Sequence, residues 1–210
     1  MTRQSKPAAR SLRRVGLLAC LAVAGLNAIA YAHARSFLYF SSDGPRTGPP
    51  EHLGAVARAK VALTGVELPR PLYHRTPADV GLPFETAFVR ASDGTRLEAW
   101  WVPADGPPRG RALLFHGYGG SKDELLDIAA WWHERGWAVG LVDFRGGGGS
   151  DGVRTPRGWE ESLDVLAMQE EAGRRGEEPI VLYGFSMGAA AIAGAIGRHG
   201  LRPDGVVLEA

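Results

Sequence analysis

The stretch Ile180-Val181-Leu182-Tyr183-Gly184-Phe185-Ser186-Met187-Gly188 decides the fold of this chain. It is an apolar run that ends in a serine flanked by glycines, and small helix-compatible residues follow from Ala189 to Ile196. The pattern predicts a strand, a tight turn and a helix, with Ser186 at the apex in a nucleophile elbow. Such a turn strains the serine backbone and pushes its hydroxyl outward, so the neighbouring positions must lack bulky side chains.

The same pattern occurs a second time, at Gly148-Gly149-Ser150-Asp151-Gly152. In a chain with 29 glycines, chance alone yields about 0.2 such matches, so the flanking residues must decide between them. Ser150 follows the glycine run Gly146–Gly149 and has neither a strand before it nor a helix after it. We therefore interpret Ser150 as a loop residue and Ser186 as the nucleophile.

Composition excludes several classes of protein. A chain of 210 residues, 45% hydrophobic and 22% charged, fits one globular domain with extensions. The net charge of +1 gives no support for a nucleic-acid partner. The single cysteine, Cys20, excludes an intrachain disulfide and a cysteine-built metal site. The 6 histidines lack the spacing of metal ligands, so we expect neither a metal nor a cofactor.

An uncharged, mostly apolar run from Val15 to Ala34 is long enough to cross a bilayer as a helix. Basic residues crowd positions 1–14, which predicts that the N-terminus stays in the cytoplasm and the rest is exported. Small residues from Ala28 to Ala34 would suit cleavage as a signal peptide, which would release a secreted protein. The length of the run and the aromatic residues near its outer end favour a retained single-pass anchor.

Residues 35–83 are rich in proline and glycine. They are predicted to form a connector that wraps towards a domain, with a short helix near Leu53–Leu63. The domain itself is predicted to begin near Phe84 and to occupy residues 84–210.

Within 84–210, strand-like runs alternate with helical runs, which predicts an α/β fold with a mostly parallel sheet and helices on both faces. Ser121 and Glu124 form a predicted capping box that opens a helix through Arg135. A second helix is predicted from Pro156 or Trp159 to Ala172. The predicted strands are 85–90, 95–102, 112–115, 138–143, the run before Ser186, and 205–208.

Three motifs in this order resemble the α/β-hydrolase superfamily: His116-Gly117 after a strand, Asp143-Phe144-Arg145-Gly146 after the next, and the Ser186 turn. The chain is similar to membrane-associated abhydrolase-domain proteins, serine aminopeptidases and acylglycerol lipases. The resemblance covers Phe84 to Ala210. It is specific for the fold and not for a substrate.

The resemblance implies a role for each matching residue. Ser186 matches the nucleophile, and the loop after His116-Gly117 matches the first oxyanion-binding element. The backbone amides of Tyr118 and Met187 are then the two oxyanion donors. His116 is expected to orient this loop and not to transfer protons. Asp143 and Arg145 match a family loop that is usually structural.

The acid and the histidine of a catalytic triad follow the nucleophile along the chain in this fold. After Ser186 the candidates are Asp204, Glu209 and His199. His199 falls at the far end of the elbow helix, about 20 Å from Ser186 at the rise of an α-helix. Glu209 is interpreted as a structural carboxylate at a strand end. We therefore interpret residues 1–210 as the N-terminal part of a longer hydrolase, or a degenerate copy, truncated after the sixth strand with an apolar edge exposed.

The sequence is compatible with two functions. The first is a membrane-anchored serine hydrolase that cleaves small-molecule or lipid esters, thioesters or small amides through a Ser186 acyl-enzyme. Its acid and histidine would lie beyond residue 210. The second is a non-catalytic α/β-hydrolase-like fragment or binding module. A nucleotide-binding protein is a poor alternative, because the glycine run lacks the spacing and helix start of a phosphate loop.

Overall fold

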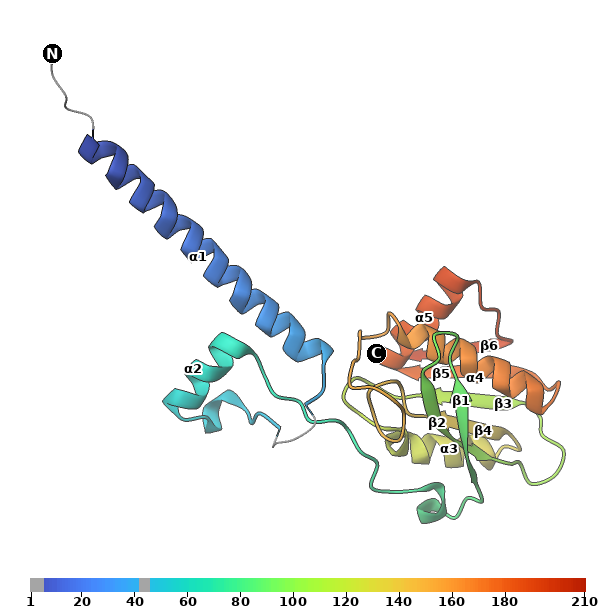
Figure 1. Cartoon of the computed structure of the whole chain (residues 1–210). Coiled ribbons are helices and arrows are strands. Elements are labelled where there is room, and N and C mark those ends of the chain that lie inside the picture. The colour runs from blue at the N-terminus through green and yellow to red at the C-terminus, as the bar shows by residue number, and fades with distance from the viewer. Residues whose placement is uncertain (1–5, 42–45) are drawn as a thin grey trace. The chain divides into compact units, whose positions relative to one another are not determined.

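The computed structural model describes residues 6–41 and 46–210, with side chains from residue 11 onward. The chain divides into two compact units (Figure 1). Unit 1 consists of Met1–Phe37 and Arg46–Glu67, and unit 2 consists of Leu38–Pro45 and Leu68–Ala210.

Unit 1 is helical. It contains most of α1 (Lys6–Leu38), the 3-10 turn η1 (Pro50–His52) and α2 (Ala55–Thr64), the short helix predicted near Leu53–Leu63. The segment Ser11–Leu38 of α1 is long and apolar enough to cross a membrane, by length and composition. It includes the predicted span, and its leucine and valine side chains are largely exposed.

Unit 2 is built on one six-stranded sheet, in the order β1-β2-β4-β3-β5-β6 (Figure 1). Strands β4, β3, β5 and β6 run parallel to one another, whereas β2 is antiparallel to both β1 and β4. The mostly parallel sheet predicted from the alternation of runs is therefore confirmed. The strands are β1 (Glu85–Arg90), β2 (Arg96–Val102), β3 (Arg111–Phe115), β4 (Ala138–Val142), β5 (Ile180–Phe185) and β6 (Gly205–Glu209).

Helices cover both faces of this sheet. On one face, α4 (Glu161–Arg175) and α5 (Met187–His199) close a core that includes Phe115 and Val142. On the other face, α3 (Leu126–His133) and the turn η2 (Pro77–Val80) lie over Leu114 and Leu141. Successive side chains along each strand therefore point into cores on opposite faces of the sheet, as strand geometry requires.

The predicted capping box at Ser121 is wrong. The Ser121 hydroxyl donates to Asp123 Oδ1 at 2.5 Å, and no side chain caps the following turn. The chain forms the 3-10 turn η3 (Lys122–Leu125) before α3 begins. The N–H of Glu124, which the cap would hold, donates instead to the Ser121 carbonyl at 3.1 Å. The backbone N–H of Lys122 bonds to Asp143, a tertiary contact.

The compact unit also begins earlier than the predicted boundary at Phe84, because Leu68–Pro83 belongs to unit 2. Contacts of Arg70 help to explain why this segment packs with unit 2. Its guanidinium donates to the carbonyl oxygens of Gly147 and Gly148, at 3.1 and 3.0 Å, and also to those of Ser150 and Gly152. Proline and glycine content alone could not distinguish this packed segment from a free connector.

Candidate active site

Ser186 lies in the strained turn that its flanking glycines predict, directly after β5. Its φ and ψ are 50° and −108°, a region that costs a non-glycine residue about 1–3 kcal/mol. Within the described part of the chain, Arg157 is the only other non-glycine residue with positive φ. The Ser186 N–H donates to the carbonyl oxygen of Glu209 at 2.7 Å, which fastens the turn to β6.

Both flanking glycines are required by close backbone packing. A Cβ at Gly184 would lie 2.6 Å from the Ala189 nitrogen, and one at Gly188 would lie 2.2 Å from the carbonyl oxygen of Phe115. Any side chain at either position would therefore displace backbone. The glycines allow β5 and α5 to approach closely enough for the turn to form.

The turn leads directly into α5, whose first helical hydrogen bond runs from the Ala190 N–H to the Ser186 carbonyl at 3.2 Å. Met187 therefore contributes its amide to the first turn, where N–H groups have no partner inside the helix and the helix dipole is positive.

The loop after β3 lies against the same turn. A Cβ at Gly117 would lie 3.0 Å from the Phe185 ring and 3.7 Å from the Ser186 Cβ. The structure thus brings together the predicted residues His116, Gly117 and Ser186. Tyr118, the next residue, stacks on Phe40 at 6.1 Å between ring centroids.

His116 is buried with both ring nitrogens engaged. Its Nε2 accepts a hydrogen bond from the Phe144 N–H at 3.1 Å, so the proton sits on Nδ1, which lies 2.8 Å from the Gly117 carbonyl oxygen. The ring therefore ties the start of its loop to the end of β4.

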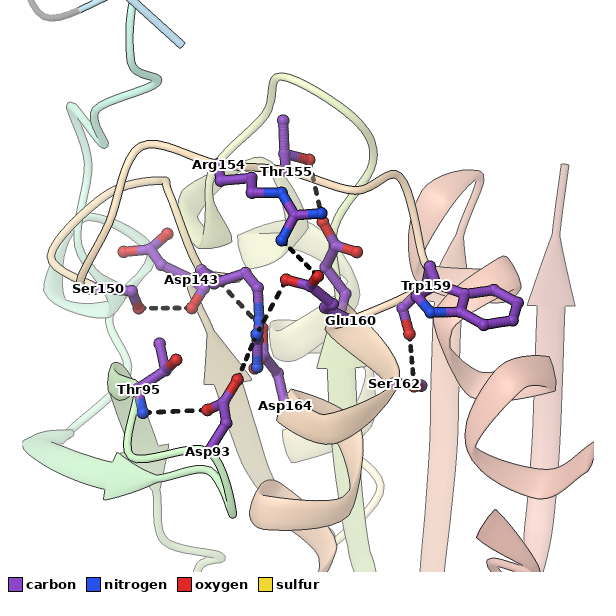
Figure 2. A network of polar contacts seen from close by, with 12 residues as sticks. Asp93, Thr95, Asp143, Ser150, Arg154, Thr155, Trp159, Glu160, Ser162 and Asp164 are labelled. Atoms are coloured by element: carbon purple, nitrogen blue, oxygen red, sulfur yellow. Dashed lines mark hydrogen bonds and ion pairs between the residues drawn. The ribbon is translucent and has the colours of Figure 1, made fainter. Parts of the chain in front are cut away.

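Ser150, the serine of the second glycine pattern, is held inside the loop after β4 (Figure 2). Its hydroxyl donates to the Asp143 carbonyl at 2.6 Å and accepts the Glu98 N–H at 2.9 Å. These bonds are those of a buried structural hydroxyl, consistent with its interpretation as a loop residue.

Arg145 connects this loop to α4 and to the β1–β2 turn. Its guanidinium bonds to Asp164 Oδ1 at 2.6 and 3.0 Å and to Asp93 Oδ2 at 2.6 Å. Burial raises the pKa of Asp164 to about 6, although Arg145 pulls in the opposite direction. Burial would lower the pKa of Arg145, but its bonds to Asp164 and Asp93 raise it on balance. Asp143 and Arg145 thus have the structural surroundings predicted for them.

The remaining triad candidates are engaged away from the Ser186 hydroxyl. His199 Nε2 lies 3.2 Å from the Ser162 hydroxyl, at the far end of α5. The Glu209 carboxylate accepts the Tyr183 hydroxyl. Burial, and then this bond, raise the pKa of Tyr183 to about 12. Over residues 11–41 and 46–210, no histidine is bonded to the Ser186 hydroxyl, and no group of three or more metal-ligating side chains occurs.

The sheet order, the strained serine turn and the adjacent glycine loop define an α/β-hydrolase. The family model for serine aminopeptidases of the S33 type matches residues 106–210. The chain belongs to this family, and its relatives are esterase-like.

Similar proteins include two curated sequences without an established activity. The uncharacterized protein YfhR of Escherichia coli O157:H7 is 29% identical, over 60% of this chain and 46% of its own length. The uncharacterized membrane protein YNL320W of Saccharomyces cerevisiae is 27% identical, over 64% of this chain and 48% of its own. This chain therefore spans about half the length of the curated relatives it matches.

Among solved structures, the Pyrococcus furiosus esterase Pf2001 is similar, with 28% identity and a TM-score of 0.55. The match covers 62% of this chain and 53% of the esterase.

Proposed function

We propose that this chain carries the nucleophile of a serine hydrolase that cleaves carboxylic esters, thioesters or small amides. The observation that carries the proposal is the strained backbone of Ser186, at φ 50°, packed against the loop that begins at His116-Gly117. Strain of this kind persists only where surrounding structure enforces it, and it concentrates at functional sites.

In the proposed mechanism the Ser186 hydroxyl attacks the substrate carbonyl carbon and forms an acyl-enzyme. The negative charge that develops on the carbonyl oxygen is received by the amides of Tyr118 and Met187. In comparable enzymes, loss of one such donor costs roughly 3 kcal/mol of barrier. His116 contributes by holding the loop that presents Tyr118.

The hydroxyl proton of Ser186 must pass to a base. Within the described residues His116 and His199 are bonded elsewhere, and the Glu209 carboxylate holds Tyr183. The proposal therefore assigns the acid and the histidine to a segment outside these 210 residues.

Ester substrates are proposed because the Pyrococcus furiosus relative is an esterase. A retained membrane anchor is proposed for α1, with the hydrolase domain on the exported side. The long apolar segment Ser11–Leu38 and the yeast relative named as a membrane protein support this. A cleaved signal peptide is the alternative, and the mass of the mature protein from its native host distinguishes the two.

A fluorophosphonate probe tests the proposal, because it reacts with activated serine nucleophiles. We expect the 210-residue chain to label slowly and only through Ser186, since no base among the described residues is bonded to its hydroxyl. Ser186→Ala should abolish labelling, whereas the matched variant Ser150→Ala should keep it. Labelling that persists in Ser186→Ala would refute the proposed nucleophile.

The second candidate is a binding module that retains the fold without the chemistry. It is favoured by the lack of a base bonded to Ser186 among the described residues. The decisive sample is the chain extended through the next downstream aspartate and histidine of its reading frame. Labelling about a hundredfold faster than that of the 210-residue chain supports the hydrolase. Equal or absent labelling supports the binding module.

A further inference from the structure

The loop that starts at His116 ends on a lysine that is entirely buried. The ammonium of Lys122 donates to Glu98 Oε1 at 2.6 Å and to Asp143 Oδ2. The backbone N–H of the same residue donates to Asp143 Oδ1 at 2.9 Å. A buried charge is costly unless it is paired and hydrogen-bonded, so this cluster of opposite charges is strongly coupled.

Two aromatic rings complete the surroundings of the ammonium. Lys122 Nζ lies 4.1 Å from the ring centroid of Tyr73 and 4.2 Å from that of Trp100, distances typical of cation–π contacts. Burial, together with Glu98 and Asp143, raises the pKa of Tyr73, so the ring stays neutral beside the carboxylates. The lysine thus joins segments from four parts of unit 2.

The glycine run after β4 closes this cluster from outside. The Gly149 N–H donates to Asp143 Oδ2 at 3.1 Å. A Cβ at Gly148 would lie 1.8 Å from Asp143 Oδ2, and one at Gly149 would lie 2.1 Å from Glu98 Oε2. The run is therefore glycine because its backbone lies directly on two internal carboxylates. The glycine run therefore contacts the carboxylates of Asp143 and Glu98, which are anions of the protein and not of a ligand.

The same loop, His116 to Lys122, is consequently fastened at both ends to the residues that follow β4. At its start His116 bonds to the Phe144 N–H, and at its end Lys122 bonds to Asp143 through its ammonium as well as through its backbone N–H. Between these anchors lie Gly117, packed against Ser186, and Tyr118. The position of the Tyr118 amide relative to Ser186 depends on both anchors.

We propose that Lys122 is a positioning residue for the reaction at Ser186: its buried ammonium locks the loop to Glu98 and Asp143 and so holds the Tyr118 amide as an oxyanion donor. This rests on the serine hydrolase function proposed above. A lysine that contributes only to global stability would leave the loop and the reactivity of Ser186 unchanged in any variant that still folds.

The variants must separate positioning from folding. Lys122→Met alone leaves two buried carboxylates without a cation and is expected to unfold at least locally. The double variant Glu98→Gln/Lys122→Met keeps the net charge of the cluster unchanged, and Asp143 keeps its two backbone N–H donors. Glu98→Gln alone retains the bond between Lys122 and Asp143. Lys60→Met, which breaks the exposed Lys60–Glu67 pair in unit 1, is the control.

The first readout is amide hydrogen exchange of residues 117–122 in the full chain, which does not depend on catalysis. In the folded double variant we expect exchange at Gly120, whose N–H is bonded within the loop to the Gly117 carbonyl, to accelerate about tenfold or more. The N–H of residue 122 keeps its bond to Asp143 and should change less, and α4 and α5 should stay protected. Glu98→Gln and Lys60→Met should exchange as the wild type does. Unchanged exchange in the folded double variant would overturn the proposal.

The second readout is the rate of fluorophosphonate labelling at Ser186. It should fall about 10- to 100-fold in the double variant, in the range seen when an oxyanion donor is lost or displaced, and stay near wild type in the two single variants. Accelerated exchange with an unchanged labelling rate would also overturn the positioning role. If the wild-type chain and its downstream-extended form do not label at all, the proposed function fails. The exchange result then still decides whether Lys122 locks the loop.

Discussion

Two segments of this chain, Gly184–Gly188 and Gly148–Gly152, share the pattern Gly-x-Ser-x-Gly and have opposite structures. In the first, Ser186 has a φ of 50° and joins a buried strand to a helix. In the second, Ser150 is buried, and its hydroxyl donates to the Asp143 carbonyl and accepts the N–H of Glu98 in β2. The difference shows that the glycine spacing only permits a tight turn. The flanking elements decide whether the serine lies at the apex of a strand–helix turn or has its hydroxyl hydrogen-bonded inside the protein.

The largest expected effect concerns the last glycine of each pattern. Gly188→Ala would place a Cβ 2.2 Å from the Phe115 carbonyl and should destabilise the fold by about 3 kcal/mol or more. Gly152→Ala meets nothing closer than 3.9 Å and bears only the cost of its positive φ, about 1–2 kcal/mol. Urea unfolding of both variants measures the difference. Equal losses would contradict the claim that close packing makes the elbow glycine necessary.

Next in size is the loss of the buried hydroxyl. Ser150→Ala leaves the Glu98 N–H without its acceptor and should cost about 1–3 kcal/mol. The matched variant Ser162→Ala removes a buried hydroxyl that is bonded to the Trp159 carbonyl and contacts Arg198 and His199. Arg198 and His199 are exposed residues that water can reach, so the loss should be about 1 kcal/mol or less. Thermal unfolding compares them. A neutral Ser150→Ala variant would mean that the second serine is not structural.

An effect of opposite sign is expected at the elbow serine. Ser186→Gly relieves the positive φ without changing the packing, and should stabilise unit 2 by about 1 kcal/mol while abolishing fluorophosphonate labelling. Ser186→Ala keeps the strain and should leave stability close to wild type. If glycine does not stabilise relative to alanine, the turn is not strained in solution.

The smallest expected effect concerns the hydrogen bond from the Tyr183 hydroxyl to the Glu209 carboxylate, which joins β5 to β6 beside the elbow. Because Tyr183 has its pKa raised to about 12, the folded protein keeps a proton that the unfolded chain loses, and stability should fall as the pH rises from 10 towards 12. Glu209→Gln removes the carboxylate that receives the hydroxyl and should lower the pKa of Tyr183 towards 10. Spectrophotometric titration of tyrosinate against Tyr183→Phe isolates this group. An unchanged titration would show that Glu209 does not hold Tyr183.

The sequence was informative where structure is local. Apolar runs bounded by turn residues predicted all six strands, and the residues around the two serines separated the elbow from the loop. The capping box at Ser121 failed because the Glu124 N–H bonds to the Ser121 carbonyl and the Ser121 hydroxyl bonds to Asp123. The turn is also held by a distant partner, since the Lys122 N–H bonds to Asp143, 21 residues further on. Lys122 and Asp164 were missed for the same reason. From sequence alone a charged residue is expected to be exposed. Lys122 and Asp164 are buried because each is paired with a charged residue of another element.

Arg70 has a consequence for the order in which the molecule assembles. Its guanidinium donates to carbonyl oxygens between Gly147 and Gly152, which lie 77 to 82 residues further along the chain. Closing so large a loop costs chain entropy that only an already formed sheet can offset, so this contact should form late in folding. Weakening it by Arg70→Met should therefore accelerate unfolding and leave the rate of refolding nearly unchanged. Arg70 would then contribute to the kinetic stability of the folded loop, because it slows unfolding without changing the rate of folding.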